Sequence, residues 1–169
     1  MAHDALPIAT MERFEITRFL RGRTLAWGIV EDRFGTLRRR FNVEMNGYWE
    51  GGSFLLDEQF VYDTGERERR QWRITPLDHG RFSATCDDCI GHAEGECLED
   101  AIRMSYCFRM QVGERTITVR IADRLYRMGD DLAINRATIR KWGVKLGELS
   151  IFFRRERGEV ADRTRAGTI

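Results

Sequence analysis

Short turns containing glycine or aspartate cut the chain from Leu25 to Arg155 into about ten segments of alternating apolar and polar residues. In chain order the turns read EDRFG, GG, DTG, DHG, DDCIG, GE, GDD and KWG. Apolar residues do not recur at helical spacing between these turns, so consecutive strands joined by hairpins are expected. Because a sheet of this size exposes two unpaired edges unless it closes, the sequence predicts an all-β fold, a single antiparallel meander barrel of about eight to ten strands.

The chain is long enough to form one domain with its own hydrophobic core, since it has 169 residues. We expect the barrel domain to span residues 12–155, between disordered tails at residues 1–11 and 156–169. The two tails are the segments without a repeating apolar pattern. The sequence contains two prolines, Pro7 and Pro76, which fits a chain built mostly of paired strands.

The segment Glu12–Arg21 departs from the strand pattern. Its apolar residues, which fall partly at helical spacing, are Phe14, Ile16, Phe19 and Leu20. This spacing predicts a short helix or turn, which we expect to close one mouth of the barrel.

The charge balance argues against a nucleic-acid partner, because the formal net charge is +1. The 26 arginines and two lysines are typical of a phosphate-binding protein or of a GC-rich genome, and the 27 interspersed acidic residues favour the second explanation. Residues 1–14 lack an apolar core of signal-peptide length, and no apolar run is long enough to span a membrane. We therefore expect a cytoplasmic protein with reduced cysteines.

Charged residues interrupt the apolar face of several predicted strands. If alternate residues face inward, the charged residues inside the barrel are Glu58, Arg70, Asp123, Arg136 and Glu148. Because an isolated buried charge is costly, these residues must pair with one another, meet water or meet a polar ligand. A network of ion pairs, a ligand cavity and acid–base catalysis by a carboxylate pair such as Glu58 and Glu148 all remain open.

Four residues in one short segment have the spacing of metal ligands, namely Cys86, Cys89, His92 and Cys97. Four such ligands can satisfy the tetrahedral geometry of zinc. However, Asp87, Asp88 and Gly91 make an ordinary turn, and small buried packing sites explain the cysteines equally simply. We expect no metal site and no cofactor.

Three long runs of the sequence carry a family resemblance. They are AWGIVEDRFG (Ala26–Gly35), LDEQFVYDTGERERRQWRI (Leu56–Ile74) and INRATIRKWGVKLGELSIFFRR (Ile134–Arg155). The runs resemble the bacterial family catalogued as domain of unknown function 3833, over nearly the whole ordered chain. The resemblance implies no known activity. The chain reads Tyr-Asp-Thr-Gly at residues 62–65, where family members often read Tyr-Asp-Asp-Gly, and Ala-Asp-Arg at residues 122–124, where they often read Asp-Asp-Trp.

The layout also resembles the calycin superfamily of lipocalins and fatty-acid-binding proteins. That resemblance implies a buried tryptophan on the first strand, at the closed end, with an arginine of a late strand across its ring. Trp27 and either Arg154 or Arg155 stand at the matching places. We expect these residues to have this structural role.

The function indicated by these features is the binding of a small, partly apolar molecule inside the barrel. The expected apolar wall consists of Phe54, Phe60, Tyr62, Tyr106 and Phe108, and the interior charges would orient a polar group of the ligand. Two alternatives stay open. One is a barrel hydrolase or isomerase that uses the interior carboxylates. The other is a packed scaffold whose partner meets the outer face at Arg67, Arg69 and Arg73.

Overall fold

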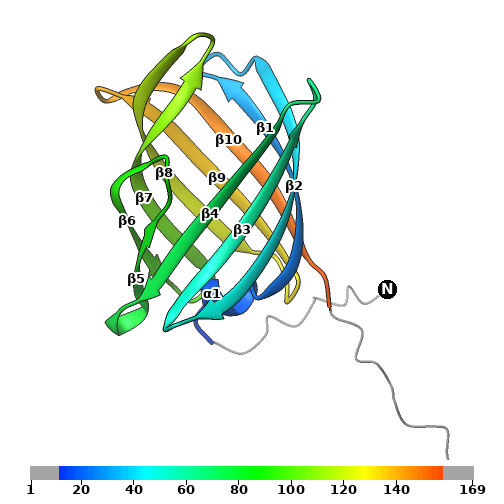
Figure 1. The fold of residues 1–169 in the computed structure, drawn as a ribbon, viewed down its shortest axis with the longest axis vertical. Helices are drawn as coiled ribbons and strands as arrows, with labels where there is room; N and C mark the ends of the chain where they lie inside the picture. Colours follow the sequence, from blue (N-terminus) through cyan, green and yellow to red (C-terminus); the bar gives the residue numbers. More distant parts are fainter. Residues whose placement is uncertain (1–11, 158–169) are drawn as a thin grey trace, which may run out of the picture.

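The computed structural model describes residues 12–157, which form one closed antiparallel barrel (Figure 1). The elements are α1 (Ile16–Phe19), β1 (Gly22–Asp32), β2 (Leu37–Glu50), β3 (Ser53–Tyr62), β4 (Arg67–Pro76), the 3-10 helix η1 (Asp78–Gly80), β5 (Arg81–Thr85), β6 (Cys89–Cys97), β7 (Ala101–Val112), β8 (Arg115–Arg127), β9 (Leu132–Lys141) and β10 (Val144–Arg155). The ten strands confirm the predicted meander barrel. The predicted tails fall almost wholly outside the described residues.

The barrel closes where the first strand pairs with the last. β1 and β10 form an antiparallel ladder from Thr24 opposite Arg155 to Asp32 opposite Gly147. Every other strand pairs with its neighbours in the sequence. The ladders are shortest on the two sides of β5, with four residue pairs each, and the ladder between β4 and β5 covers only Arg73–Pro76 of β4. Among the described residues, no strand pairs with that side of β4 between Arg67 and Trp72.

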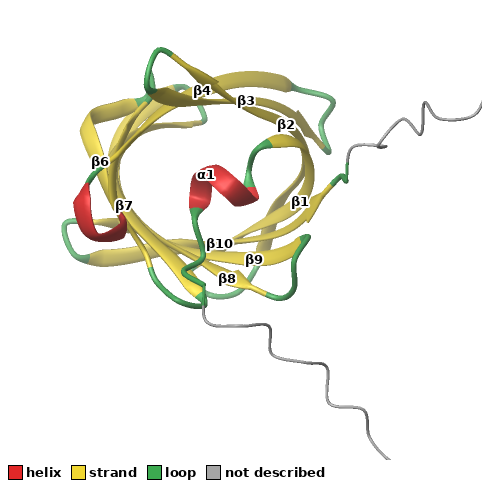
Figure 2. Ribbon diagram, turned by 90° about the horizontal axis from the view of Figure 1, so that it is seen from below, coloured by secondary structure: helices red, strands yellow, loops and turns green. Residues whose placement is uncertain are grey.

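The short helix α1 lies within the outline of the barrel at one end, as the view from below shows (Figure 2). Phe14, Ile16, Phe19 and Leu20 are all buried in the core, which confirms the prediction of a short helix or turn at one mouth. Gly47 of β2 makes room for the helix, because a Cβ atom there would lie 2.1 Å from the backbone oxygen of Leu20. We call this the α1 end. The opposite, distal end is formed by the turns between β1 and β2, β3 and β4, β5 and β6, β7 and β8, and β9 and β10.

The core is densest near α1 and looser toward the distal end. Near α1 the inward side chains, such as Phe54, Phe82 and Phe153, are buried. Nearer the distal end, inward residues such as Val30 and Met110 are only partly buried. No helix within residues 12–157 is long and apolar enough to cross a membrane.

The inward faces of β9 and β10 differ from the predicted ones. In β9 the buried residues are Ala133, Ala137 and Ile139, so Arg136 faces outward. In β10 the register shifts between Lys145 and Gly147, and this bulge turns Glu148 to the outside. The predicted interior positions of Arg136 and Glu148 are therefore wrong. In β10 the bulge inverts the phase of the strand, whereas in β9 apolar residues stand on both faces, so alternation alone does not identify the inward face.

Trp27 is also not where the resemblance to calycins places it. It is 39% exposed on the outer face of β1, while its neighbour Ala26 is buried in the core. The inner face of β1 carries small residues at this height because the Phe41 ring fills the space beside Gly28. The Arg154 guanidinium does lie over the indole, 5.3 Å from the ring centroid. The predicted contact with Arg154 is confirmed, but the prediction that Trp27 is buried is wrong.

Candidate functional site

Polar side chains from five strands meet in the middle of the barrel. They are Glu58 of β3, Glu68 and Arg70 of β4, Tyr106 of β7, Asp123 of β8 and Asn135 of β9. Glu58 and Asp123 are each 9% exposed, and they are the two buried carboxylic acids among the described residues. We call these six residues the interior cluster. It unites three of the charged residues predicted inside the barrel, Glu58, Arg70 and Asp123.

Arg70 is the centre of the cluster. Its Nη2 atom donates a hydrogen bond to Oε1 of Glu68 over 2.5 Å, while Nη1 lies 3.9 Å from Oε2 of Glu58. The contact with Glu68 is therefore a hydrogen-bonded ion pair, and the contact with Glu58 is a loose one. Tyr62 adds a hydrogen bond from its hydroxyl to Oε2 of Glu68, over 2.8 Å.

Two aromatic rings hold the Arg70 side chain in place. Its guanidinium carbon lies 4.9 Å from the ring centroid of Phe60 and 4.8 Å from that of Phe108. Cation–π contacts of this kind orient the planar guanidinium and cover its faces. Its edge therefore remains as the surface that can hydrogen-bond to a neighbour.

Asp123 lies on the other side of the barrel, beside Tyr106 and Asn135. Nδ2 of Asn135 donates a hydrogen bond to Oδ1 of Asp123, over 3.1 Å. Tyr106 packs edge-on against both Trp72 and Phe108. Aromatic rings thus connect the two halves of the interior cluster.

Burial changes the protonation of both acids. It raises the pKa of Glu58 to about 7, with the positive charge of Arg70 opposing the shift and Asp123 adding to it. Burial likewise raises the pKa of Asp123 to about 6, although hydrogen bonds from Tyr106 and Asn135 favour the charged form. Both carboxyl groups therefore exchange protons close to neutral pH. Such values are typical of binding and catalytic sites, although structural networks also produce them.

Several buried polar atoms of the interior lack a hydrogen-bond partner among the described residues. They include Oε2 of Glu58, Nε of Arg70 and Oδ1 of Asn135. A buried polar atom without a partner costs about 1–3 kcal/mol, so such atoms are rare in folded proteins. Three in one cluster mark a place where a polar molecule would gain hydrogen bonds at no cost to existing ones.

A cavity of about 570 Å³ reaches Glu58 and Arg70. Its lining also includes the outward neighbours of these residues on β3 and β4, together with Asp87 and Asp88 of the turn between β5 and β6. The cavity therefore lies at the barrel wall beside the half of β4 that has no ladder to β5, where it adjoins two members of the interior cluster.

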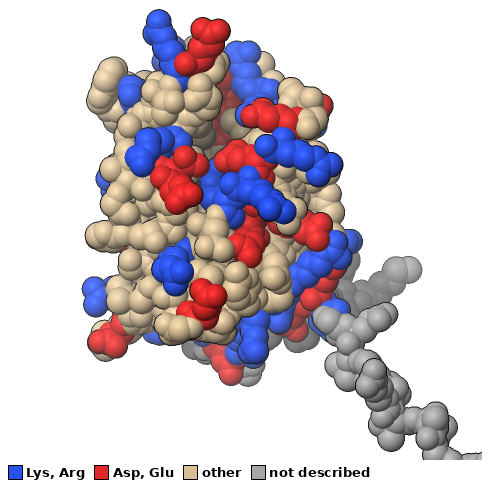
Figure 3. Space-filling model, viewed as in Figure 1, with Lys and Arg blue, Asp and Glu red and all other residues tan. Residues whose placement is uncertain are grey.

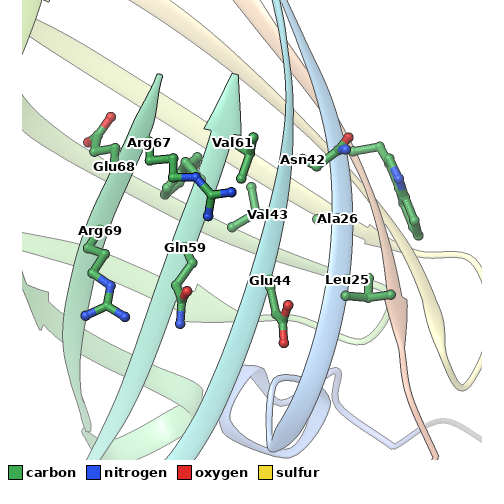
Figure 4. Close-up of a pocket in the computed structure, with 12 residues that line it drawn as sticks. Leu25, Ala26, Asn42, Val43, Glu44, Gln59, Val61, Arg67, Glu68 and Arg69 are labelled. Carbon is green, nitrogen blue, oxygen red and sulfur yellow. The ribbon is translucent and has the colours of Figure 1, made fainter. Parts of the chain in front are cut away.

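A second hollow, of about 540 Å³, lies against β1–β4 (Figure 4). Outward-facing residues line most of it, including Leu25, Asn42, Glu44, Gln59, Val61, Arg67 and Arg69. Figure 3 shows acidic and basic side chains interspersed over this face of the molecule. The lining also includes inward residues, namely Ala26, Val43, Phe60 and Glu68, so the hollow adjoins the interior cluster at Glu68. It contains neither of the two buried acids, so Glu58, Arg70 and Asp123 are the better candidate site.

Arg136 and Glu148 form an ion pair on the outside instead of lining the interior. Nη2 of Arg136 lies 3.6 Å from Oε2 of Glu148, and Lys145 Nζ lies 2.9 Å from the other carboxylate oxygen. The Lys145 side chain, by hydrogen bonding and charge, lowers the pKa of Glu148. The carboxylate pair of Glu58 and Glu148 suggested by the strand pattern does not exist.

The residues with metal-ligand spacing are spread along β6. Cys89 and Cys97 are its first and last residues, so the length of the strand separates them. His92 is exposed, and Cys86 precedes the strand in the adjoining turn. Burial raises the pKa of both the Cys86 and the Cys97 thiol to about 11. Within residues 12–157, no three histidine, cysteine or acidic side chains are grouped as a metal ion would require.

Two members of the interior cluster were missed by the sequence reasoning. Glu68 has a clear signal, because it stands two residues before Arg70 and so shares its face of the strand. Asn135 was missed because the phase of β9 was inverted. The expected wall residues Phe54, Phe60, Tyr62, Tyr106 and Phe108 all line the interior, although Phe54 lies near α1 and away from the cluster.

Comparisons with known proteins identify a family and a fold. Residues 7–155 match the model of a family described as a protein of unknown function (DUF3833). An S-type phycobiliprotein lyase from Guillardia theta has a similar structure, with a TM-score of 0.61 and 9% identity over 85% of this chain and 92% of the lyase. A protein of unknown function from the DUF3598 family of Nostoc punctiforme aligns with a TM-score of 0.60 and 10% identity, over 83% of this chain and 49% of its own. No curated protein matches the sequence. At these identities the two structures show a shared fold alone.

Proposed function

The chain belongs to the DUF3833 family, and we propose that it binds a small, partly apolar molecule inside the barrel, with Glu58, Arg70 and Asp123 orienting the ligand. The observation that carries the proposal is the cavity that reaches Glu58 and Arg70 while each has a buried polar atom without a partner. A barrel of the same fold serves as a phycobiliprotein lyase in Guillardia theta, so this architecture supports a biochemical function in another protein.

The chemistry of the cluster indicates what the ligand carries. The edge of the Arg70 guanidinium offers a donor, and Oε2 of Glu58 offers an acceptor when ionised or a donor when protonated. A ligand with a hydrogen-bond acceptor beside a donor would satisfy both atoms. The rings of Phe60, Phe108 and Tyr106 would pack against its apolar part.

The second candidate is catalysis by the same carboxyl groups. A group whose pKa is about 7, as for Glu58, can both accept and donate a proton at neutral pH. Asp123 contributes a second acid with a pKa of about 6. If the protein is an enzyme, Glu58 is the residue we expect to transfer the proton, and the retained molecule would be a substrate or product.

The test is native mass spectrometry of the full chain purified from its own host. We expect the wild-type protein to retain a small molecule. Glu58→Gln keeps the shape of the side chain but removes the charge and the titration, so it should lower the retained fraction about tenfold, as expected for one hydrogen bond to a charged group. Arg136→Gln is the matched control, because Arg136 is a charged residue on the outer surface.

The outcomes separate three readings of the interior. Loss of the molecule in Glu58→Gln but not in Arg136→Gln supports the proposal. Chemical conversion of the retained molecule by the wild type, and not by Glu58→Gln, would favour the enzyme. A protein that retains nothing, or retains the same fraction in all three forms, would contradict ligand binding and favour a packed scaffold.

A further inference from the structure

Two aromatic side chains at the distal end of the barrel are almost fully exposed to solvent. Phe34, in the turn between β1 and β2, is 78% exposed, and Trp142, in the turn between β9 and β10, is 91% exposed. Leu37, Val112 and Val144, in or beside the turns of this end, are also exposed. Large apolar side chains this bare need an explanation, because water contact costs them their hydrophobic stabilisation.

The two turns belong to neighbouring hairpins. β1 pairs with β10 up to Asp32 opposite Gly147, and the turns begin just beyond this ladder on the same side. Both turns lie at the end of the molecule opposite to α1 (Figure 1). Phe34 and Trp142 therefore project from the same rim of the barrel.

Trp142 is also unfavourable for its own turn. Its φ angle is 50° and that of Gly143 is 78°, so both residues lie in the left-handed region. Two-residue hairpin turns of this shape favour asparagine or glycine at the first position, because a bulky side chain is strained there. The turn thus holds a tryptophan that neither its backbone conformation nor burial explains.

A cation accompanies each of the two rings. The Arg33 guanidinium carbon lies 4.8 Å from the ring centroid of Phe34, and Lys141 Nζ lies 4.7 Å from that of Trp142. Residues 140–145 contain three basic residues and no acidic residue, and both lysines of the chain are among them. Of the three, Lys145 is paired with Glu148, so Arg140 and Lys141 supply the charge of this turn. In the neighbouring turn, the acidic residue Asp32 is already paired with Arg38.

We propose that this rim binds the surface of an anionic lipid bilayer, with Phe34 and Trp142 inserted among the headgroups. Aromatic rings with a polar or charged companion are favoured at the depth of the headgroups, and basic residues are attracted to anionic lipids. Phe34 and Trp142 project separately, so a lipid bilayer can accept both side chains anywhere on its surface, whereas a protein partner would need a matching pocket for each. The proposal concerns the outer rim and stands independently of what the interior cluster binds.

The experiment measures binding of the full chain to vesicles. Wild-type protein should sediment with vesicles of phosphatidylglycerol and phosphatidylcholine, and the tryptophan emission should shift to the blue on binding. Trp142→Asn should weaken binding about tenfold because it removes the inserted ring. Lys141→Gln should weaken it about fivefold, and raised salt should weaken it further.

Stability measurements distinguish this role from a structural one. Trp142→Asn places a favoured residue in a left-handed turn, so we expect its thermal midpoint to equal or exceed that of the wild type. Phe152→Thr is the matched control, because Phe152 is an exposed aromatic on the barrel wall, away from the rim. It should bind vesicles like the wild type. Wild-type protein that stays in solution with anionic vesicles, or binding that Trp142→Asn and Phe34→Ser leave unchanged, would overturn the proposal.

Discussion

The carboxyl group of Glu58 is exposed to two opposing influences inside the barrel. Burial and the neighbouring Asp123 favour its neutral form, while Arg70 at 3.9 Å favours the charged form. Burial prevails because Arg70 is already engaged by Glu68 at 2.5 Å. The result is a carboxyl group whose pKa lies about 7 instead of at its ordinary 4.5.

This shift predicts a dependence of stability on pH. An acid whose pKa is raised by folding stabilises the protein fully below its unfolded pKa, and the contribution is lost as pH rises through the folded pKa. For Glu58 the window runs from 4.5 to about 7. The wild type should therefore lose about 3 kcal/mol of unfolding free energy as the pH rises from 4.5 to about 7, whereas Glu58→Gln should not, because its side chain does not titrate. Urea titrations of both proteins across this pH window measure the difference.

Glu148→Gln is the control for this prediction. The pKa of Glu148 is lowered by Lys145, so its contribution is present above the unfolded pKa and is lost as pH falls. Its effect should be constant across the window of Glu58. Parallel pH profiles for the wild type and Glu58→Gln would contradict the assignment of a raised pKa.

The exposed position of Trp27 gives a second prediction at the residue scale. Its side chain contacts Phe152 at 6.2 Å between ring centroids and lies under Arg154, but it does not fill the core. Trp27→Ala should cost no more than about 2 kcal/mol of unfolding free energy, from lost surface contacts. Phe54→Ala, at a fully buried residue, should cost about 3–5 kcal/mol. Equal losses in chemical denaturation would show that Trp27 packs as a core residue.

At the scale of elements, α1 depends on the barrel around it. A helix of four residues is not stable by itself, so its burial inside the barrel mouth must maintain it. The edge-on contact between Phe14 and Phe19, with centroids 5.1 Å apart, ties the helix to the segment before it. The close approach of Leu20 to Gly47 fixes the position of α1 against β2.

Gly47→Ala tests this contact between α1 and β2. The added methyl would lie 2.1 Å from the oxygen of Leu20 and 2.5 Å from the ring of Phe54, so α1 or β2 must move. We expect a loss of about 1–3 kcal/mol in unfolding free energy, as for other overpacked cores. Gly129→Ala is the control, because a Cβ there meets nothing within 4 Å. It should change stability by less than about 0.5 kcal/mol.

At the scale of the whole molecule, barrel closure links all ten strands. Each strand pairs with two others, and the longest unpaired stretch within one is the half of β4 beside the cavity. Separating any two neighbouring strands would therefore expose two unpaired strand edges and part of the shared core. Such an arrangement favours unfolding as a single unit.

We expect unfolding by urea to give the same midpoint by far-ultraviolet circular dichroism and by tryptophan fluorescence. The fluorescence probes are well placed for this comparison, since Trp72 lies inside the barrel and Trp27 and Trp49 lie on it. A fluorescence transition that precedes the loss of strand signal would show that the distal half opens first, contrary to this expectation.

Much of the barrel is encoded locally and could be predicted from the sequence. Turn residues between alternating segments specify the hairpins, and hairpins in series specify the order of the strands. The same alternation identifies Glu58, Arg70 and Asp123 as interior charges. In β3, β4 and β8 the large apolar residues lie mainly on one face, so the inward face of each strand is clear from the sequence.

The tertiary structure alone decided the phase of β9 and β10 and the position of Trp27. In β9 both faces carry apolar residues, and the face that turns inward is the one that places Asn135 beside Asp123 of the adjacent strand β8. In β10 a bulge between Lys145 and Gly147 reverses the alternation. At Trp27 the ring of Phe41 already occupies the inner space beside the neighbouring Gly28. These outcomes depend on partners distant in the sequence, whereas turns and alternation depend on adjacent residues.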